Sequence, residues 1–138
     1  NVANGQAANN TDYGLLDVDT FEPYPAYYGL AMWRDFGDEL LEVSVGFEPS
    51  ELSVYAGRSP DGTIRLVIIN KSARSLTTQL ELDSVGPVRT SARTVQADDL
   101  TATEIELSER GAGEAPAIPG PWQFPAWSIT SVTIRPPA

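Results

Sequence analysis

The fold of this chain is decided by residues 52–69, which read Leu52-Ser53-Val54-Tyr55-Ala56-Gly57-Arg58-Ser59-Pro60-Asp61-Gly62-Thr63-Ile64-Arg65-Leu66-Val67-Ile68-Ile69. Apolar and other side chains alternate from Leu52 to Ala56, which is typical of a half-buried strand. The segment Ser59-Pro60-Asp61-Gly62 favours a tight turn, because proline presets the φ angle of the second position and glycine accepts a positive φ. The strand after the turn loses its polar alternation in its second half, so we expect it to be central and covered on both faces. Residues 52–69 therefore predict a β-hairpin.

Further short strands are predicted on both sides of this hairpin. They cover residues 41–45, 76–82, 88–97 and 128–135. The strand at 88–97 is polar and is expected near a sheet edge. In the last strand the apolar residues switch from one face of the strand to the other along its length, which predicts a bulge. Residues 98–121 are weakly patterned and end in a loop rich in glycine, alanine and proline. About six to eight short strands with turns between them predict a mainly β fold, an antiparallel β-sandwich.

One amphipathic helix is predicted ahead of the strands, within Ala26-Tyr27-Tyr28-Gly29-Leu30-Ala31-Met32-Trp33-Arg34-Asp35-Phe36-Gly37-Asp38. Prolines precede it, where a missing backbone N–H does no harm, and Gly37 follows it, where helices commonly close. Its apolar residues fall on more than one side, and such a helix is buried on several sides. A single sheet does not cover a helix in that way. We therefore expect a bridging helix, with residues 1–37 (a leader, one strand and the helix) separate from a β-sandwich at 38–138.

Composition excludes several classes of function. The 138-residue, 14.9 kDa chain has a net charge of −10, which argues against nucleic acid or an anionic membrane surface as partner. No apolar run approaches the length of a membrane span. Cysteine and histidine are both absent, which removes disulfides, thiolate nucleophiles, imidazole triads and the usual zinc sites. We expect no cofactor and no metal.

A family resemblance appears in the order of the motifs. Along the chain these are Tyr13-Gly14-Leu15-Leu16-Asp17, the helix quoted above, Leu52-Ser53-Val54-Tyr55-Ala56, Leu66-Val67-Ile68-Ile69-Asn70-Lys71-Ser72 and Phe124-Pro125-Ala126-Trp127-Ser128-Ile129-Thr130. Together they resemble the C-terminal part of a retaining glycoside hydrolase of clan A, which has a (β/α)₈ catalytic barrel and an appended β-sandwich. The layout is most similar to family-44-type endoglucanases and xyloglucanases, with family-39 and family-51-type enzymes as close alternatives.

This resemblance implies that residues 13–16 are the last barrel strand and residues 24–36 the last barrel helix. The catalytic glutamates of such enzymes would precede Asn1, so no residue of this chain inherits a catalytic role. The chain would be the non-catalytic C-terminal portion of a secreted carbohydrate-degrading enzyme. It would brace the barrel, its partner, by interdomain packing of four aromatic residues: Tyr27, Tyr28, Trp33 and Phe36. Two alternatives stay open, a free-standing carbohydrate-binding module and a secreted structural β-sandwich without sugar contact.

Four residues are candidates for contact with a polysaccharide. If the barrel is present, Asp12, Tyr13 and Asp17 would lie at the C-terminal end of its last strand, the face on which barrel active sites are built. Trp122 lies in the proline-rich loop, where we expect its indole to be exposed and able to stack on a sugar ring.

Other polar patterns have simpler interpretations. Glu104 and Glu106, at alternate positions of a strand, have the spacing of a retaining carboxylate pair, but a solvated strand face is the preferred interpretation, since nothing supplies a cleft or an apolar pocket. Asp17, Asp19 and Glu22 offer oxygen ligands for calcium, yet they lack the calcium-loop pattern, so turn and capping roles are the preferred interpretation. The segment Asn70-Lys71-Ser72 matches a glycosylation acceptor, a motif short enough to occur by chance.

Overall fold

The computed structural model describes residues 14–17, 19–83 and 86–136, and this part of the chain is mainly β. It contains one short helix and eight strands: α1 (Pro25–Ala31), β1 (Glu39–Leu41), β2 (Leu52–Arg58), β3 (Ile64–Asn70), β4 (Leu76–Leu80), β5 (Thr90–Gln96), β6 (Glu106–Arg110), β7 (Gly120–Phe124) and β8 (Ser128–Ile134).

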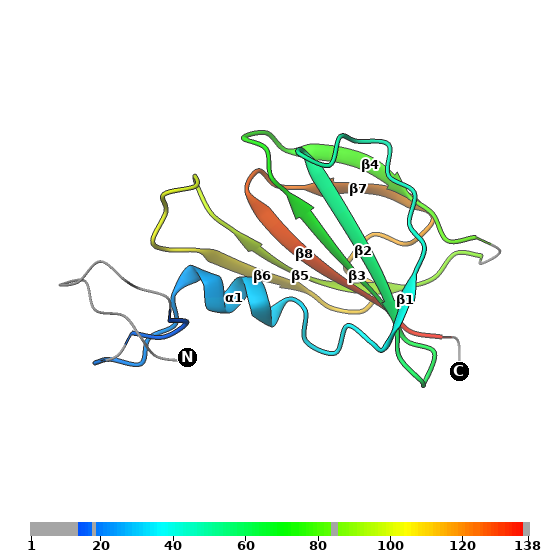
Figure 1. Ribbon diagram of the computed structural model, residues 1–138. Helices are drawn as coiled ribbons and strands as arrows, with labels where there is room; N and C mark the ends of the chain where they lie inside the picture. Colours follow the sequence, from blue (N-terminus) through cyan, green and yellow to red (C-terminus); the bar gives the residue numbers. More distant parts are fainter. Residues whose placement is uncertain (1–13, 18, 84–85, 137–138) are drawn as a thin grey trace.

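The strands form two antiparallel sheets. The larger sheet has the order β1-β2-β3-β8-β5-β6, and the smaller sheet pairs β4 with β7. The small sheet covers one face of the large sheet, and α1 lies on the opposite face (Figure 1). The predicted β-sandwich is therefore confirmed, and so is the predicted hairpin of β2 and β3. The strand β3 is central as expected, with Val67 and Ile68 both fully buried although they point to opposite faces.

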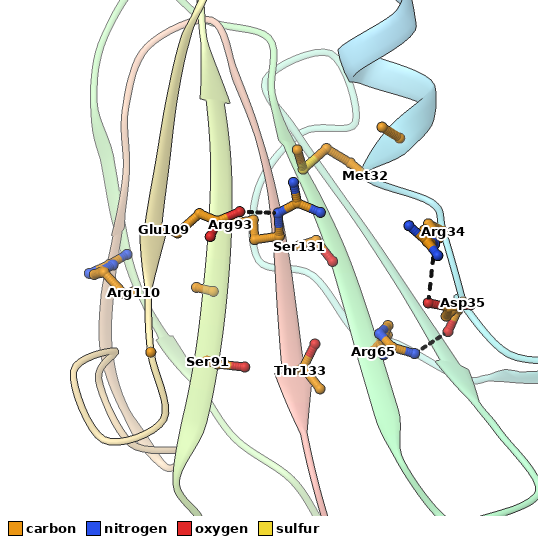
Figure 2. A pocket seen from close by; sticks show the side chains of 13 residues that line it. Met32, Arg34, Asp35, Arg65, Ser91, Arg93, Glu109, Arg110, Ser131 and Thr133 are labelled. Atoms are coloured by element: carbon orange, nitrogen blue, oxygen red, sulfur yellow. Dashed lines mark hydrogen bonds and ion pairs between the residues drawn. The ribbon is translucent and has the colours of Figure 1, made fainter.

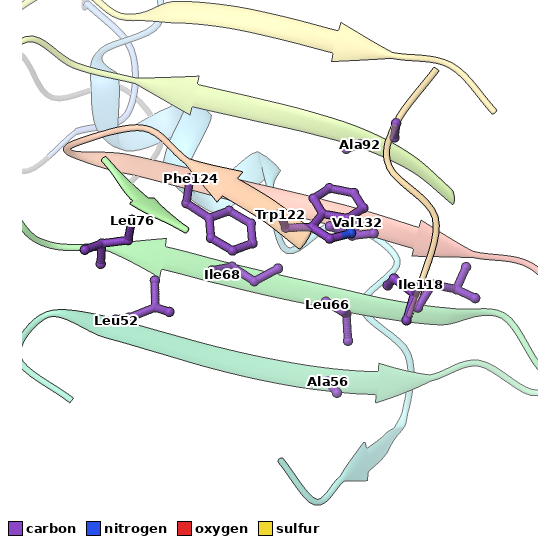
Figure 3. Close-up of a cluster of buried hydrophobic side chains, with 12 residues drawn as sticks. Leu52, Ala56, Leu66, Ile68, Leu76, Ala92, Ile118, Trp122, Phe124 and Val132 are labelled. Atoms are coloured by element: carbon purple, nitrogen blue, oxygen red, sulfur yellow. The ribbon is translucent and has the colours of Figure 1, made fainter. Parts of the chain in front are cut away.

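The core lies between the two sheets. On β3 and β8 the inward residues include Leu66, Ile68 and Val132, and they meet Trp122 and Phe124 of β7 (Figure 3). The two aromatic rings are stacked, with centroids 6.2 Å apart and planes 17° from parallel. All five side chains have relative exposures of 7% or less. Burying a large apolar side chain contributes about 1.5–3 kcal/mol, so this cluster is the main stabilising element.

The opposite face of the large sheet is apolar at one end and polar at the other. The pairing register aligns Ile69, Ile129 and Val95 in one row across β3, β8 and β5. Helix α1 passes close to this row, because a Cβ added at Gly29 would lie 3.5 Å from the Cδ1 atom of Ile129. Met32, directly after α1, is 2% exposed. The apolar row therefore explains why the helix sits at that end of the sheet.

The chain after α1 continues across the outer face of β2. The Trp33 ring lies 5.2 Å from Phe36 and 5.2 Å from Tyr55, centroid to centroid. The Phe36 carbonyl oxygen lies close to Gly57: a Cβ added at Gly57 would be 2.2 Å from this oxygen. This segment therefore belongs to the sandwich, and the helix is shorter than the predicted 24–36. It ends because the backbone turns at residues 32–35 and adopts a positive φ of 56° at Asp35 and 102° at Gly37.

Residues 14–17 make an isolated bridge, Leu16 to Pro23, and their assignment as the last strand of a barrel stays a prediction. The prediction of a bulge in the last strand is wrong. The strand β8 has no bulge: all seven of its residues pair in unbroken register with both β3 and β5. Apolar residues occur on both faces of β8 because both faces are covered. The polar strand β5 lies near the sheet edge as expected, next to the edge strand β6, and β6 itself comes from the weakly patterned region.

Candidate functional site

Asp17 is the one predicted polysaccharide-contacting acid that lies among the described residues; Asp12 and Tyr13 lie outside them. Its carboxylate closes a turn by accepting hydrogen bonds from the backbone N–H groups of Asp19 (2.9 Å) and Thr20 (2.8 Å). It also accepts one from the Tyr24 hydroxyl at 3.1 Å. The Thr20 and Asp19 backbone N–H groups lower the pKa of Asp17, since they stabilise the charged form. Turn formation is thus what this carboxylate does in the fold.

The alternative of a calcium site near Asp17 finds no support in this geometry. Within residues 14–17, 19–83 and 86–136, no three acidic side chains converge in the manner of a metal site. An open pocket of about 910 Å³ does lie beside Asp17, between the segment that leads into α1 and the loop before β6. Glu22 and Tyr28 line it on one side and Glu104 on the other. Glu104 precedes β6, whereas Glu106 is its first residue, so the two do not share a strand.

Trp122 is not exposed, and the prediction that it lies in a loop is wrong. It lies in β7, and its relative exposure is 0%. Its Nε1 donates to the carbonyl oxygen of Ala117 at 3.3 Å, and the Arg110 guanidinium lies 5.5 Å from its ring centroid. An indole enclosed in this way has no face for a sugar ring. The alternation of Trp122 and Phe124 around Gln123 was the signal for a strand, but the neighbouring prolines obscured it.

The four aromatic residues expected at an interdomain interface separate into two pairs. Tyr27 and Tyr28 lie on α1 and contact each other edge to face at 5.5 Å, whereas Trp33 and Phe36 pack on β2 of this same domain. The outer side of α1, formed by Tyr27 and Leu30, is exposed: these side chains are 41% and 59% accessible. Nothing in the described chain covers this apolar surface, which is the kind that marks an interaction site.

A second pocket, called here the polar pocket, lies on the outer face of the large sheet beside the end of α1. It has a volume of about 290 Å³ and its lining includes Arg65 of β3, Ser131 and Thr133 of β8, and Ser91 and Arg93 of β5 (Figure 2). Glu109 of β6 pairs with Arg93, Nε to carboxylate oxygen, at 2.8 Å. Arg65 donates to the backbone carbonyl oxygen of Asp35. No local pattern in the sequence indicates this pocket, because its residues come from four strands and the end of the helical segment, which are distant in the sequence.

None of the helices in the described ranges has the length and apolar character required to cross a lipid bilayer.

Comparison with solved structures shows which proteins share this fold. An arabinofuranosidase aligns with a TM-score of 0.68 at 14% identity, over 88% of this chain and 31% of its own. A glycoside hydrolase family 30 subfamily 8 xylanase from Clostridium acetobutylicum aligns with a TM-score of 0.67 at 15% identity, over 89% and 31%. A family 44 xyloglucanase from Paenibacillus polymyxa aligns with a TM-score of 0.57 at 16% identity, over 73% and 19%.

These solved structures are glycoside hydrolases, and the chain spans about a third or less of the length of each. At such low identity the likeness shows a shared fold and does not assign a particular family. No protein-family model matches the sequence, and no curated protein matches it.

Proposed function

We propose that this chain is the non-catalytic β-sandwich of a secreted glycoside hydrolase, joined to the last strand and helix of its catalytic barrel. The enzyme it belongs to would be most similar to family-44-type endoglucanases and xyloglucanases. The sandwich braces the barrel, which is its partner and which carries the catalytic glutamates outside this chain.

The observation that carries the proposal is the exposed apolar side of α1. The inner side of the helix packs on the large sheet near Ile129, whereas Tyr27 and Leu30 point away from it. A short helix with apolar residues on both sides is suited to lie between two bodies. The partial coverage of the hydrolase structures supports the same proposal, because each of them has much more chain than this sandwich occupies.

In this arrangement residues 13–16 would be the last barrel strand, and Asp12, Tyr13 and Asp17 would lie around its C-terminal end, beside the substrate cleft. Asp12 and Tyr13 are the side chains offered to the polysaccharide, while Asp17 shapes the turn that follows. Glu22 and Tyr28 flank the open pocket on the same side of the molecule and would extend the cleft wall.

Intact-mass measurement of the native protein tests the proposal directly. We expect a protein much larger than 14.9 kDa that contains this sequence in its C-terminal part. A complete native protein of 14.9 kDa would overturn it.

Three measurements on the 138-residue chain distinguish the proposal from a carbohydrate-binding module. The chain should bind an apolar dye and self-associate in light scattering through Tyr27 and Leu30, and it should give no heat with xyloglucan in calorimetry. Clear heat of binding from a chain that is monomeric and does not bind dye would favour the binding module.

A further inference from the structure

The polar pocket has a composition that the bracing role does not explain. The chain carries a net charge of −10 and only nine lysines and arginines, yet four arginines line this one pocket: Arg34, Arg65, Arg93 and Arg110. If the few basic residues of this acidic chain were distributed at random over its surface, four arginines in one pocket would not be expected. Two carboxylates, Asp35 and Glu109, line the pocket as well, so only part of this positive charge is available to a ligand. An arginine that no carboxylate neutralises attracts anions.

The four arginines differ in how far they are already neutralised. Arg93 is paired with Glu109, and Arg34 lies 3.7 Å from the Asp35 carboxylate. Arg110 is turned toward the core, where it lies over the Trp122 ring. Arg65 donates to a backbone carbonyl, and within the described residues no carboxylate lies within salt-bridge distance of it, although Asp61 feels its charge from farther away. Arg65 is thus the guanidinium best placed to bind an incoming anion.

Three hydroxyl groups lie between Arg65 and Arg93. Thr133 pairs in register with both Arg65 and Ser91, and Ser131 pairs with Arg93, so the three residues occupy adjacent positions of β8 and β5 on one face. Figure 2 shows Ser131 near the Arg93 guanidinium and Thr133 beside Arg65. Ser131 is 9% exposed, and its hydroxyl makes no hydrogen bond to any other described side chain or carbonyl. Each hydroxyl offers a donor and an acceptor to a ligand.

From this juxtaposition we propose that the polar pocket binds a uronic acid residue. The planar guanidinium of Arg65 matches the two oxygens of the sugar carboxylate, whereas Arg93, already paired with Glu109, adds less to the attraction. The hydroxyl row of Ser91, Ser131 and Thr133 exchanges hydrogen bonds with the hydroxyls of the sugar ring. The pocket volume of about 290 Å³ suits a ligand of one residue.

The residues that line the polar pocket also favour an acidic sugar over a neutral one. Among the described residues, no aromatic ring lines the polar pocket, so they offer no platform on which a neutral sugar would stack. Recognition depends instead on charge and hydroxyl contacts. The choice of a sugar acid over another hydroxylated carboxylate rests on the proposed function, since that function places the chain beside a polysaccharide.

Titration of the ¹⁵N-labelled 138-residue chain tests this site, with glucuronate, glucose and sulfate as separate probes. Glucuronate should shift the amide signals of β5 and β8 around Ser91 and Ser131, with binding in the millimolar range or tighter. Glucose and sulfate should each bind at least about tenfold more weakly, because each lacks one of the two contact types. Equal binding of sulfate or of glucose, or no shift with glucuronate at about 50 mM, would overturn the proposal.

Substitutions locate the site and separate it from protein contacts. Arg65→Gln should weaken glucuronate binding about tenfold, and Arg93→Gln should weaken it by a smaller factor because Glu109 already pairs with Arg93. Thr133→Val, which keeps the shape of the side chain and removes its hydroxyl, should weaken it by a smaller factor. The matched control is Arg58→Gln, which removes a surface pair with Glu39 outside the pocket and should leave binding unchanged. Variants at Arg65 and Arg93 that bind glucuronate normally would overturn the assignment.

The two proposals fail separately. A native protein of 14.9 kDa that binds glucuronate would overturn the bracing role and support the glucuronate site. A longer native protein whose sandwich does not bind glucuronate would support the bracing role and overturn the glucuronate site.

Discussion

The side-chain Nδ2 of Asn70 donates to the main-chain carbonyl oxygen of Phe124 at 3.1 Å, which joins the end of β3 in one sheet to the end of β7 in the other. The same nitrogen lies 2.9 Å from the carbonyl oxygen of Arg74 and 2.7 Å from that of Pro125. Its Oδ1 accepts from the backbone N–H of Ser72. Asn70 is 2% exposed, so the residue that matches a glycosylation acceptor is a structural link between the sheets.

Replacing this amide by a carboxylate should destabilise the fold strongly. In Asn70→Asp an acceptor oxygen would face three carbonyl oxygens in a buried site, and we expect a loss of about 3 kcal/mol or more in the free energy of unfolding. Urea denaturation measures it. The control Gln79→Glu makes the same chemical change at an exposed position and should shift stability by less than about 0.5 kcal/mol. Equal effects of the two variants would contradict the buried link.

Trp122 should behave as a core residue. Trp122→Ala is expected to lower the free energy of unfolding by about 3–5 kcal/mol, since it removes the largest fully buried side chain. Acrylamide quenching of single-tryptophan variants checks its burial: a chain that retains only Trp122 should be quenched less than one that retains only Trp33. Strong quenching of Trp122 would restore the discarded interpretation as an exposed sugar platform.

Gly57 is required by the close approach of the segment after α1. A methyl group in Gly57→Ala would lie 2.2 Å from the Phe36 carbonyl oxygen and 2.9 Å from its ring, so we expect a loss of about 1–3 kcal/mol. Increased hydrogen exchange at residues 33–37 should accompany it as the segment lifts away. Gly46→Ala is the matched control, because a Cβ there meets nothing within 4 Å.

The two sides of the helical segment should respond differently to the same substitution. Met32→Gln, at a position 2% exposed, should cost about 2–3 kcal/mol. Leu30→Gln, at a position 59% exposed, should change stability by less than about 0.5 kcal/mol and reduce binding of an apolar dye. Thermal unfolding and dye fluorescence measure the two effects. A large loss of stability in Leu30→Gln would show that this side is already covered within the chain.

Acid should weaken the turn between β2 and β3. The backbone N–H of Thr63 donates to the Asp61 carboxylate at 2.9 Å and lowers the pKa of Asp61 below its ordinary value of 3.8. A lowered folded pKa means that this stabilisation is present above about pH 4 and is lost as the pH falls through the folded value. Asp61→Asn keeps an acceptor for Thr63 and should flatten the dependence of stability on pH below about 4. An unchanged slope in denaturation curves at pH 2–5 would contradict this.

For the hairpin at residues 52–69, the local sequence pattern was sufficient to predict the structure. Alternation and a Pro-Asp-Gly turn identified both strands of the hairpin and the central place of β3, because hydrogen bonding across a tight turn leaves little freedom of register. Failures came where a strand lacked alternation in the sequence. The strand β6 is exposed along most of its length, so it has no apolar face to detect. The strand β8 is covered on both faces, so its parity looked inconsistent.

What the sequence by itself determined is the class of fold: short alternating strands with turns between them predict a β-sandwich with a helix ahead of it, and the absence of cysteine and histidine excludes several chemistries. Only the tertiary structure decided which side chains meet. It placed Trp122 in the core and gathered Arg65 and Arg93 around one pocket, although they lie 28 positions apart in the sequence. The physical reason is that strand periodicity is a local property, whereas the pairing of β3 and β5 on either side of β8 depends on long-range packing.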